Sequence, residues 1–254
     1  TGVFGKTGTG KSFLTRILLA EIIQKSEVVS LIFDMHGEYG WSHRSETGTD
    51  VKGLKQLFPS KVAVFTLDEE SAKRRGVSAD FLVQIGYDEI EASDIATLGG
   101  TLNLNETQMQ AAERLERRLG RGWLKTFLAS DSREALAELA GDTEHEGTLV
   151  ALHRRLQALW RFPFLTDRGH EDSVKRLMEY LDRGTHVVLE FGSYASNLTA
   201  YILVANLLTR RVHARYVERM ERAIGMQGEA SRPLIIAIEE AHKFLSSDLA
   251  GHTT

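Results

Sequence analysis

The sequence predicts an α/β fold in which a mostly parallel sheet is flanked by helices. Three observations predict it. A glycine-rich loop at residues 5–12 is followed by a helix pattern and then by an apolar strand pattern. Four nearly continuous Val/Ile/Leu runs are spread along the chain, and such runs are typical of strands covered on both faces. A series of helix patterns between about 88 and 182 separates the second of these runs from the third.

The glycine-rich loop matches the phosphate-binding pattern G-x-x-x-x-G-K-[ST] in full. Its glycines allow a tight turn, so that successive amide N–H groups can point at phosphate oxygens. Lys11 would reach the β- and γ-phosphates, and the Ser12 hydroxyl would ligate Mg²⁺. A glycine-rich turn that only caps a helix is the alternative, but the flanking elements favour a nucleotide site. The predicted cofactor-binding residues are Gly5, Lys6, Thr7, Gly8, Thr9, Gly10, Lys11, Ser12 and Phe13.

The first elements after the loop are an amphipathic helix and a buried strand. The helix is predicted from Lys11 to about Lys25. Its positive N-terminal end, at Lys11, would lie under the phosphates. The strand is predicted at Val28–Phe33. Loop, helix and strand in this order are typical of an α/β nucleotide-binding unit. The apolar residues on one face of the predicted helix are Leu14, Ile17, Leu18 and Ile22.

An acidic residue ends this strand and opens the run Asp34-Met35-His36-Gly37-Glu38-Tyr39. Strand ends in open α/β sheets face the ligand crevice, so Asp34 is expected to help hold the metal or a water molecule. We interpret His36 and Glu38 as parts of a solvated turn.

The remaining strands are predicted at 61–67, 185–191 and 234–238, with another at 77–87. The helices carry apolar residues at 3.6-residue spacing. Those between about 88 and 182 are interpreted as a helical insertion within a single domain that covers residues 1–254. The predicted helices lie at 105–119, 122–129, 132–139, 148–162, 171–181 and 197–222.

Two adjacent acids follow the last apolar strand, in the run Leu234-Ile235-Ile236-Ala237-Ile238-Glu239-Glu240-Ala241-His242. Glu239 is expected to hold Mg²⁺ through water, and Glu240 to orient and polarise the attacking water. The alternative is an exposed helix start, where acids are also favoured. Beside a complete phosphate-binding loop, the pair favours hydrolysis. The predicted catalytic residues are Glu240, Glu239, Lys11 and Asp34, and the predicted metal ligands are Ser12 and Glu239.

Composition excludes several classes of protein. The 254 residues are 42% hydrophobic and 26% charged, with a net charge of −4, so a uniformly basic nucleic-acid-binding surface is excluded. The absence of cysteine excludes disulfides and thiolate zinc sites and favours a cytoplasmic location. No apolar run approaches the roughly 20 residues of a membrane helix.

Three motifs, GKTGTGKS, FDMHGEY and IIAIEEAH, together resemble the HerA branch of the HerA/FtsK superfamily of hexameric DNA-pumping ATPases. The stretches Ala151–Leu156 and Leu181–Gly184 are also similar to the central domain of that family. The resemblance implies a RecA/FtsK-like P-loop fold and ATP at the interfaces of a six-membered homo-oligomeric ring. It further implies translocation on double-stranded DNA in repair or antiphage defence, with a NurA-type nuclease or another effector as partner.

The chain departs from the full family pattern at both ends. Little precedes the phosphate-binding loop, and the family's N-terminal β-barrel and the sensor strand and arginine beyond the acidic pair are absent. We therefore expect an internal fragment of a longer protein. Arg154, Arg155 and Arg161 are candidates for an arginine finger, but a solvated helix face explains them as well.

Two basic clusters, at 114–121 and 210–219, could contact DNA phosphates, although interleaved acids favour ion pairs on exposed helices. An ATP-gated scaffolding ring that regulates an effector is the main alternative function. A small-molecule kinase also stays open. A GTPase and an ABC-type ATPase are disfavoured, because the Asn-Lys-x-Asp and Leu-Ser-Gly-Gly motifs are absent.

Overall fold

The chain forms two compact units in the computed structural model, and the long helix α11 (Leu198–Gly225) contributes residues to both. The first unit comprises residues 1–83, 174–196 and 211–241, and the second comprises 84–173, 197–210 and 242–254. The structure describes residues 2–4, 10–25, 27–44, 48, 50–141, 144–167, 172–225 and 232–243. The stretch 5–9, which holds most of the predicted phosphate-binding loop, lies outside the described residues.

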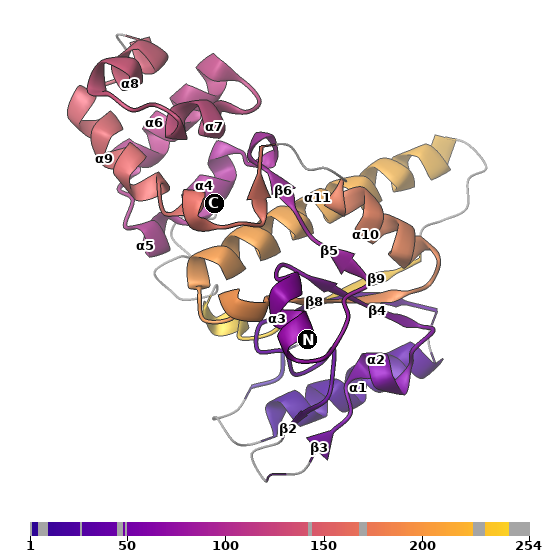
Figure 1. The fold of residues 1–254 in the computed structure, drawn as a ribbon. Helices are drawn as coiled ribbons and strands as arrows, with labels where there is room; N and C mark the ends of the chain where they lie inside the picture. The colour runs from indigo at the N-terminus through magenta and orange to yellow at the C-terminus, as the bar shows by residue number, and fades with distance from the viewer. Residues whose placement is uncertain are drawn as a thin grey trace. The chain divides into compact units, whose positions relative to one another are not determined.

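A five-stranded parallel sheet organises the first unit (Figure 1). Its three inner strands are buried along their whole length, as their Val/Ile/Leu composition predicts. The predicted α/β fold and its four main strands are confirmed. In spatial order the strands are β5 (Phe81–Leu82), β4 (Val62–Thr66), β8 (His186–Glu190), β1 (Val29–Asp34) and β9 (Leu234–Ile238).

The register of the sheet brings the ends of its strands together. Asp34 at the end of β1 lies opposite Glu190 at the end of β8, and Glu190 lies opposite Thr66 at the end of β4. Phe33 lies opposite Ile238, so Glu239 follows at the same edge. Parallel strands that end level place these side chains along one carboxyl edge.

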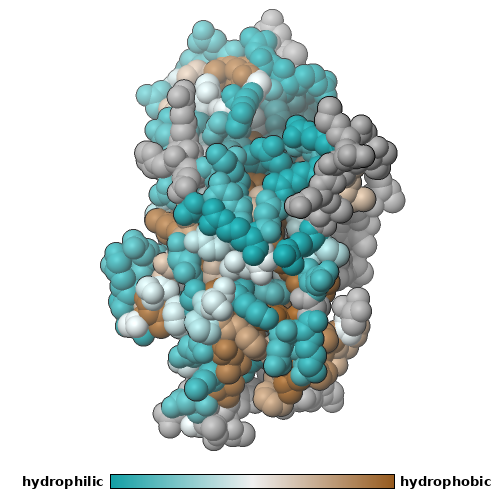
Figure 2. All heavy atoms as spheres, turned by 90° about the vertical axis from the view of Figure 1, so that its right-hand side faces the viewer, coloured by the Kyte–Doolittle hydropathy of each residue, from teal (hydrophilic) through white to brown (hydrophobic). Residues whose placement is uncertain are grey.

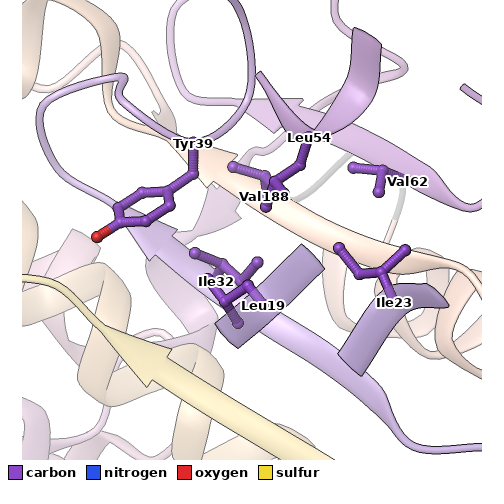
Figure 3. Packing of buried hydrophobic residues seen from close by; sticks show 7 residues of the cluster. All are labelled: Leu19, Ile23, Ile32, Tyr39, Leu54, Val62 and Val188. Atoms are coloured by element: carbon purple, nitrogen blue, oxygen red, sulfur yellow. The ribbon is translucent and has the colours of Figure 1, made fainter. Parts of the chain in front are cut away.

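Helices cover both faces of the sheet (Figure 1). The helices α1 (Lys11–Lys25) and α2 (Leu54–Leu57) lie on one face, and α10 (Ser173–Asp182) lies on the other with part of α11. Figure 3 shows the core beneath α1 and α2, where both helices meet three strands and one tyrosine. The residues of this cluster are Leu19, Ile23, Ile32, Tyr39, Leu54, Val62 and Val188.

The bounds predicted for α1 are confirmed, but the apolar face assigned to it is not the one that packs on the sheet. Leu19 and Ile23 are buried, whereas Leu14, Ile17 and Leu18 are about half exposed. Apolar residues occur all round this helix, so periodicity cannot select the packed face. Figure 2 shows hydrophobic residues at the surface toward its lower end, at the level where Figure 1 places α1.

Short elements complete the first unit. The 35–40 turn follows β1, and the antiparallel pair β2–β3 follows that turn. Helix α3 and the 3-10 turn η4 follow β4 and β8, and η5 follows β9. Their bounds are β2 His43–Arg44, β3 Asp50–Val51, α3 Glu69–Arg74, η4 Gly192–Tyr194 and η5 Ala241–Lys243.

Within its described residues, the second unit is helical apart from one pair of short parallel strands. Trp123 and Phe127 are buried at its core, and the Trp123 indole donates a hydrogen bond to the Ile90 carbonyl at 3.2 Å. The elements are β6 (Ile85–Gly86), η1 (Tyr87–Glu89), α4 (Ala92–Thr97), α5 (Gly99–Leu102), α6 (Glu106–Leu119), α7 (Trp123–Leu128), α8 (Arg133–Ala140), α9 (Glu146–Leu156), η3 (Leu159–Arg161) and β7 (Leu165–Thr166).

A buried carboxylate joins α4 to α11 within this unit. Asp94 is fully buried and accepts hydrogen bonds from the Asn206 amide at 2.9 Å and the Arg210 guanidinium at 2.7 Å. It also accepts the Glu91 N–H at 2.9 Å and so caps its own helix. Both carboxylate oxygens are therefore satisfied, which a buried charge requires.

We predict that Asp94→Ala lowers the free energy of unfolding by roughly 2 to 4 kcal/mol, because Arg210 and Asn206 lose their buried acceptor. Chemical denaturation followed by circular dichroism measures this loss. Asp88→Ala is the matched control, since its ion pair with Arg121 is exposed and should contribute about 1 kcal/mol or less. Equal losses in the two variants would contradict this account of the buried network.

Candidate nucleotide-binding site

The described part of the phosphate-binding motif forms the start of α1. Gly10 has φ +82°, a conformation that glycine adopts without strain, and its carbonyl accepts the Leu14 N–H at 2.9 Å. Lys11 and Ser12 follow as the first residues of the helix, and both are half-buried. In the predicted phosphate-binding motif, this helix start and Lys11 would provide positive charge for the phosphates. Phe13 is 59% exposed.

Asp34 folds the chain back on itself immediately after β1. Its side chain is fully buried and accepts the backbone N–H groups of Glu38 at 2.8 Å, Tyr39 at 2.8 Å and Gly40 at 3.1 Å. Burial raises the pKa of Asp34, and these hydrogen bonds oppose that rise. Since both of its oxygens accept N–H groups from its own turn, the geometry favours a role in shaping the turn over direct contact with a metal.

The turn is tied to the helix that carries Lys11 and Ser12. The guanidinium of Arg16 is buried, donates to the Glu38 carbonyl at 2.8 Å, and lies 5.8 Å from the centre of the Tyr39 ring. Thr15 hydrogen-bonds the Tyr39 side chain. The start of α1 and the end of β1 thus form one connected site.

Glu239 joins this site from the neighbouring strand. Its carboxylate accepts the His36 backbone N–H at 3.1 Å, so the acid after β9 touches the turn after β1. Burial, followed by the charges of Asp34 and Glu38, raises the pKa of Glu239 to about 8, against backbone hydrogen bonds that lower it. A buried carboxyl group with a strongly raised pKa beside other acids is a candidate functional group.

Glu240 has a left-handed backbone conformation, with φ +51°, in the turn that begins η5. Such a conformation is uncommon for a residue other than glycine and tends to occur at functional sites. Glu240 is half-buried. The side chain of His242, the last residue of the predicted motif, lies outside the described residues.

Mg²⁺ fits the oxygen donors that the site offers. Within the described ranges, no group of three or more His, Asp or Glu side chains is arranged to hold a metal. Mg²⁺ does not need such a group, because it keeps several waters and takes one or two protein oxygens beside those of the phosphates. The Ser12 hydroxyl and the Glu239 carboxylate remain the predicted ligands.

Sequence reasoning missed three residues at this edge of the sheet. Arg16 looked like a surface residue of an amphipathic helix, yet it is buried against the turn. Glu190 is 1% exposed and forms an ion pair with Arg75. Glu190 is an acid at the end of a buried strand, and this is the same sequence signal that identified Asp34. The sequence carried no signal for Arg75.

Most arginines of the two basic clusters are held in ion pairs, many of them to other elements rather than along one helix. Arg154 and Arg155 lie at the end of α9 and Arg161 ends η3, all in the second unit. The paired arginines of the clusters are Arg114 with Glu144, Arg121 with Asp88, Arg210 with Glu91 and Asp94, Arg215 with Glu218, and Arg219 with Asp182. Among the helices that the structure describes, none combines the length and apolar character of a membrane span.

We predict that Glu239→Gln changes how stability depends on pH. The carboxyl group binds a proton in the folded state up to about pH 8, whereas in the unfolded state its pKa is near 4.5. The stability that it contributes is therefore full below the unfolded pKa and is lost as the pH rises through the folded one. Without Mg²⁺ or nucleotide, the melting temperature of Glu239→Gln relative to the unmodified protein should rise between about pH 5 and about pH 8.

Thermal unfolding followed by circular dichroism across this pH range measures the effect. Glu240→Gln removes a negative charge from the adjacent residue and is the matched control. A Glu239→Gln profile parallel to that of the unmodified protein would show that Glu239 does not titrate in this window.

The site combines a helix N-terminus that carries Lys11 and Ser12, a turn that Asp34 stabilises, and the acids Glu239 and Glu240 that follow the adjacent strand β9. A search of curated proteins found no match. A comparison with protein families matches residues 1–212 to the central domain of the helicase HerA. This family implies an ATPase of the HerA/FtsK type. Because the match covers most of the chain, the protein belongs to the helicase HerA central domain family.

Proposed function

We propose that this chain is the ATP-hydrolysing domain of a DNA translocase or helicase that works as a hexameric ring. The observation that carries the proposal is the convergence of three sequence motifs at one edge of the sheet: the start of α1, the turn after β1, and the acids after β9. The contacts of Arg16 with Glu38 and of His36 with Glu239 join them.

Each residue has a separate task in this proposal. The loop from Gly5 to Phe13 holds the phosphates of ATP, with Lys11 as the charge on the β- and γ-phosphates. Ser12 and Glu239 hold Mg²⁺, which neutralises the phosphate charge. Glu240 orients and polarises the attacking water. Asp34 acts by holding the turn that contacts Glu239.

Family membership supports the remaining parts of the proposal. A HerA-type ATPase would bind ATP between subunits of a ring and move double-stranded DNA through its pore. We place this protein in the cytoplasm, in DNA end processing or antiphage defence, with a NurA-type nuclease or another effector as partner.

An ATP-gated scaffolding ring is the second candidate function. One observation favours it: the arginines of both predicted DNA-contact clusters are largely engaged by Asp and Glu side chains. An arginine already paired within the chain has less to gain from a DNA phosphate. A scaffold would hydrolyse ATP at a rate that is indifferent to DNA.

We predict that Lys11→Ala weakens the binding of Mg-ATP by at least about tenfold, because it removes the charge that meets the β- and γ-phosphates. Titration of the full-length protein with a fluorescent ATP analogue measures the affinity. Lys25→Ala at the other end of α1 is the matched control, since Lys25 is exposed and paired with Glu21. Unchanged affinity in Lys11→Ala would contradict the nucleotide site.

We predict that Glu240→Gln keeps ATP affinity but lowers turnover by roughly a hundredfold or more, because the attacking water loses its base. Steady-state ATPase assays with and without linear duplex DNA measure turnover. Glu21→Gln on the surface of α1 is the control. An ATPase rate that rises several-fold with duplex DNA supports the translocase. An ATPase rate that does not change with DNA supports the scaffold. Normal hydrolysis by Glu240→Gln would show that another residue is the base.

A further inference from the structure

The carboxyl edge of the sheet holds a buried ion pair that the proposed chemistry does not use. Glu190 ends the central strand β8 and is 1% exposed, while the side chain of its partner Arg75 is 37% exposed. One oxygen of the carboxylate, Oε2, accepts a hydrogen bond from Nη2 of Arg75. The other oxygen, Oε1, is buried and has no hydrogen-bond partner within the described residues.

Packing alone does not explain this arrangement. A buried carboxylate with one unsatisfied oxygen costs stability, and an apolar side chain at the end of β8 would avoid that cost. Burial raises the pKa of Glu190 and the charge of Asp34 adds to this, whereas Arg75 opposes it. Unsatisfied buried polar groups are rare in native proteins, and a functional role is one explanation for them.

Glu190 and Arg75 both lie directly against the turn that Asp34 shapes. A Cβ atom on Gly40 would clash with Glu190 Oε1, so the backbone of the turn packs directly against this carboxylate. A Cβ atom on Gly37 would lie 3.3 Å from Arg75 Nη1, and Gly37 has φ +71°. The pair therefore supports the turn at two points, on the side of β8.

The helix that carries Arg75 is itself fixed to the end of β8. Arg75 is the C-cap residue of α3. At the other end of this helix, the N-cap residue Asp68 accepts hydrogen bonds from the backbone N–H and the hydroxyl of Ser193, just beyond β8. Asp68 and Arg75 thus attach the two ends of α3 to the end of β8. This attachment restricts where the guanidinium of Arg75 can lie relative to the turn.

We infer that Arg75, held by Glu190, is a positioning residue for the ATPase site. It fixes the turn whose His36 N–H contacts Glu239, and so sets the place of the acidic pair relative to the bound nucleotide. Neither Arg75 nor Glu190 needs to touch the nucleotide for this role. The inference rests on the proposed ATPase function and adds a positioning pair to it.

The experiment compares four variants of the full-length protein: Arg75→Ala, Arg75→Lys, Glu190→Gln and the double variant Arg75→Ala/Glu190→Gln. Each is assayed for kcat, for ATP affinity with a fluorescent analogue, and for its melting temperature. Arg74→Ala, at the adjacent and exposed position of the same helix, is the matched control.

We expect Arg75→Ala to lower kcat by about tenfold or more while ATP affinity changes by less than about threefold, because a misplaced acid impairs the chemical step more than binding. Arg75→Lys should restore part of kcat, since it keeps the charge. The double variant should be no slower than Arg75→Ala, because the two side chains act as one unit. Arg74→Ala should behave like the unmodified protein.

A fall in melting temperature with kcat unchanged would overturn the inference and leave the pair a purely structural role. If Arg75→Ala does not fold, Arg75→Lys and Glu190→Gln test the same expectation, which is a loss of kcat with little change in ATP affinity. Full turnover by Lys11→Ala would instead refute the proposed ATPase site. Turnover that depends on Lys11 but not on Arg75 would refute the positioning role alone.

Discussion

The burial of one carboxylate, Asp34, is the constraint on which the site depends. A carboxylate within the sheet must find hydrogen-bond donors, and the nearest donors are the N–H groups of the next few residues. By accepting those of Glu38, Tyr39 and Gly40, Asp34 folds the chain into a tight turn. The turn places the Glu38 carbonyl where it accepts a hydrogen bond from Arg16, and it places Tyr39 in the core beneath α1. It also presents an N–H group to Glu239.

Buried acidic side chains gather along this edge of the sheet. Asp34 and Glu190 end the adjacent strands β1 and β8, Glu239 follows β9, and burial raises the pKa of each. Arg16 donates to the Glu38 carbonyl of the turn, and Arg75 pairs with Glu190. A divalent cation carried by a nucleotide would supply the charge that these acids lack. The second unit uses a buried acid differently, because Asp94 has all of its partners within the protein.

Much of the fold could be predicted from the sequence, because strands buried on both faces have continuous apolar sequences. The four main strands and the bounds of α1 follow from such local patterns. Helix α6 begins where Asn105 and Gln108 form a capping box, which is also a local signal. The packed face of α1 could not be predicted, because apolar residues surround that helix and only the sheet selects Leu19 and Ile23.

The sequence by itself determined the phosphate-binding motif, the acids Asp34, Glu239 and Glu240, and the strand ends that carry them. Membership in the HerA family follows from a match over residues 1–212, which include the phosphate-binding motif and Asp34. Only the tertiary structure decided how these motifs meet, because strand order and register are set by contacts between residues far apart in the chain. The pair of Arg75 and Glu190, 115 positions apart, shows why. Neither residue belongs to a motif. The pairing of β8 with β1 on one side and with β4, which precedes the helix of Arg75, on the other places them against the same turn.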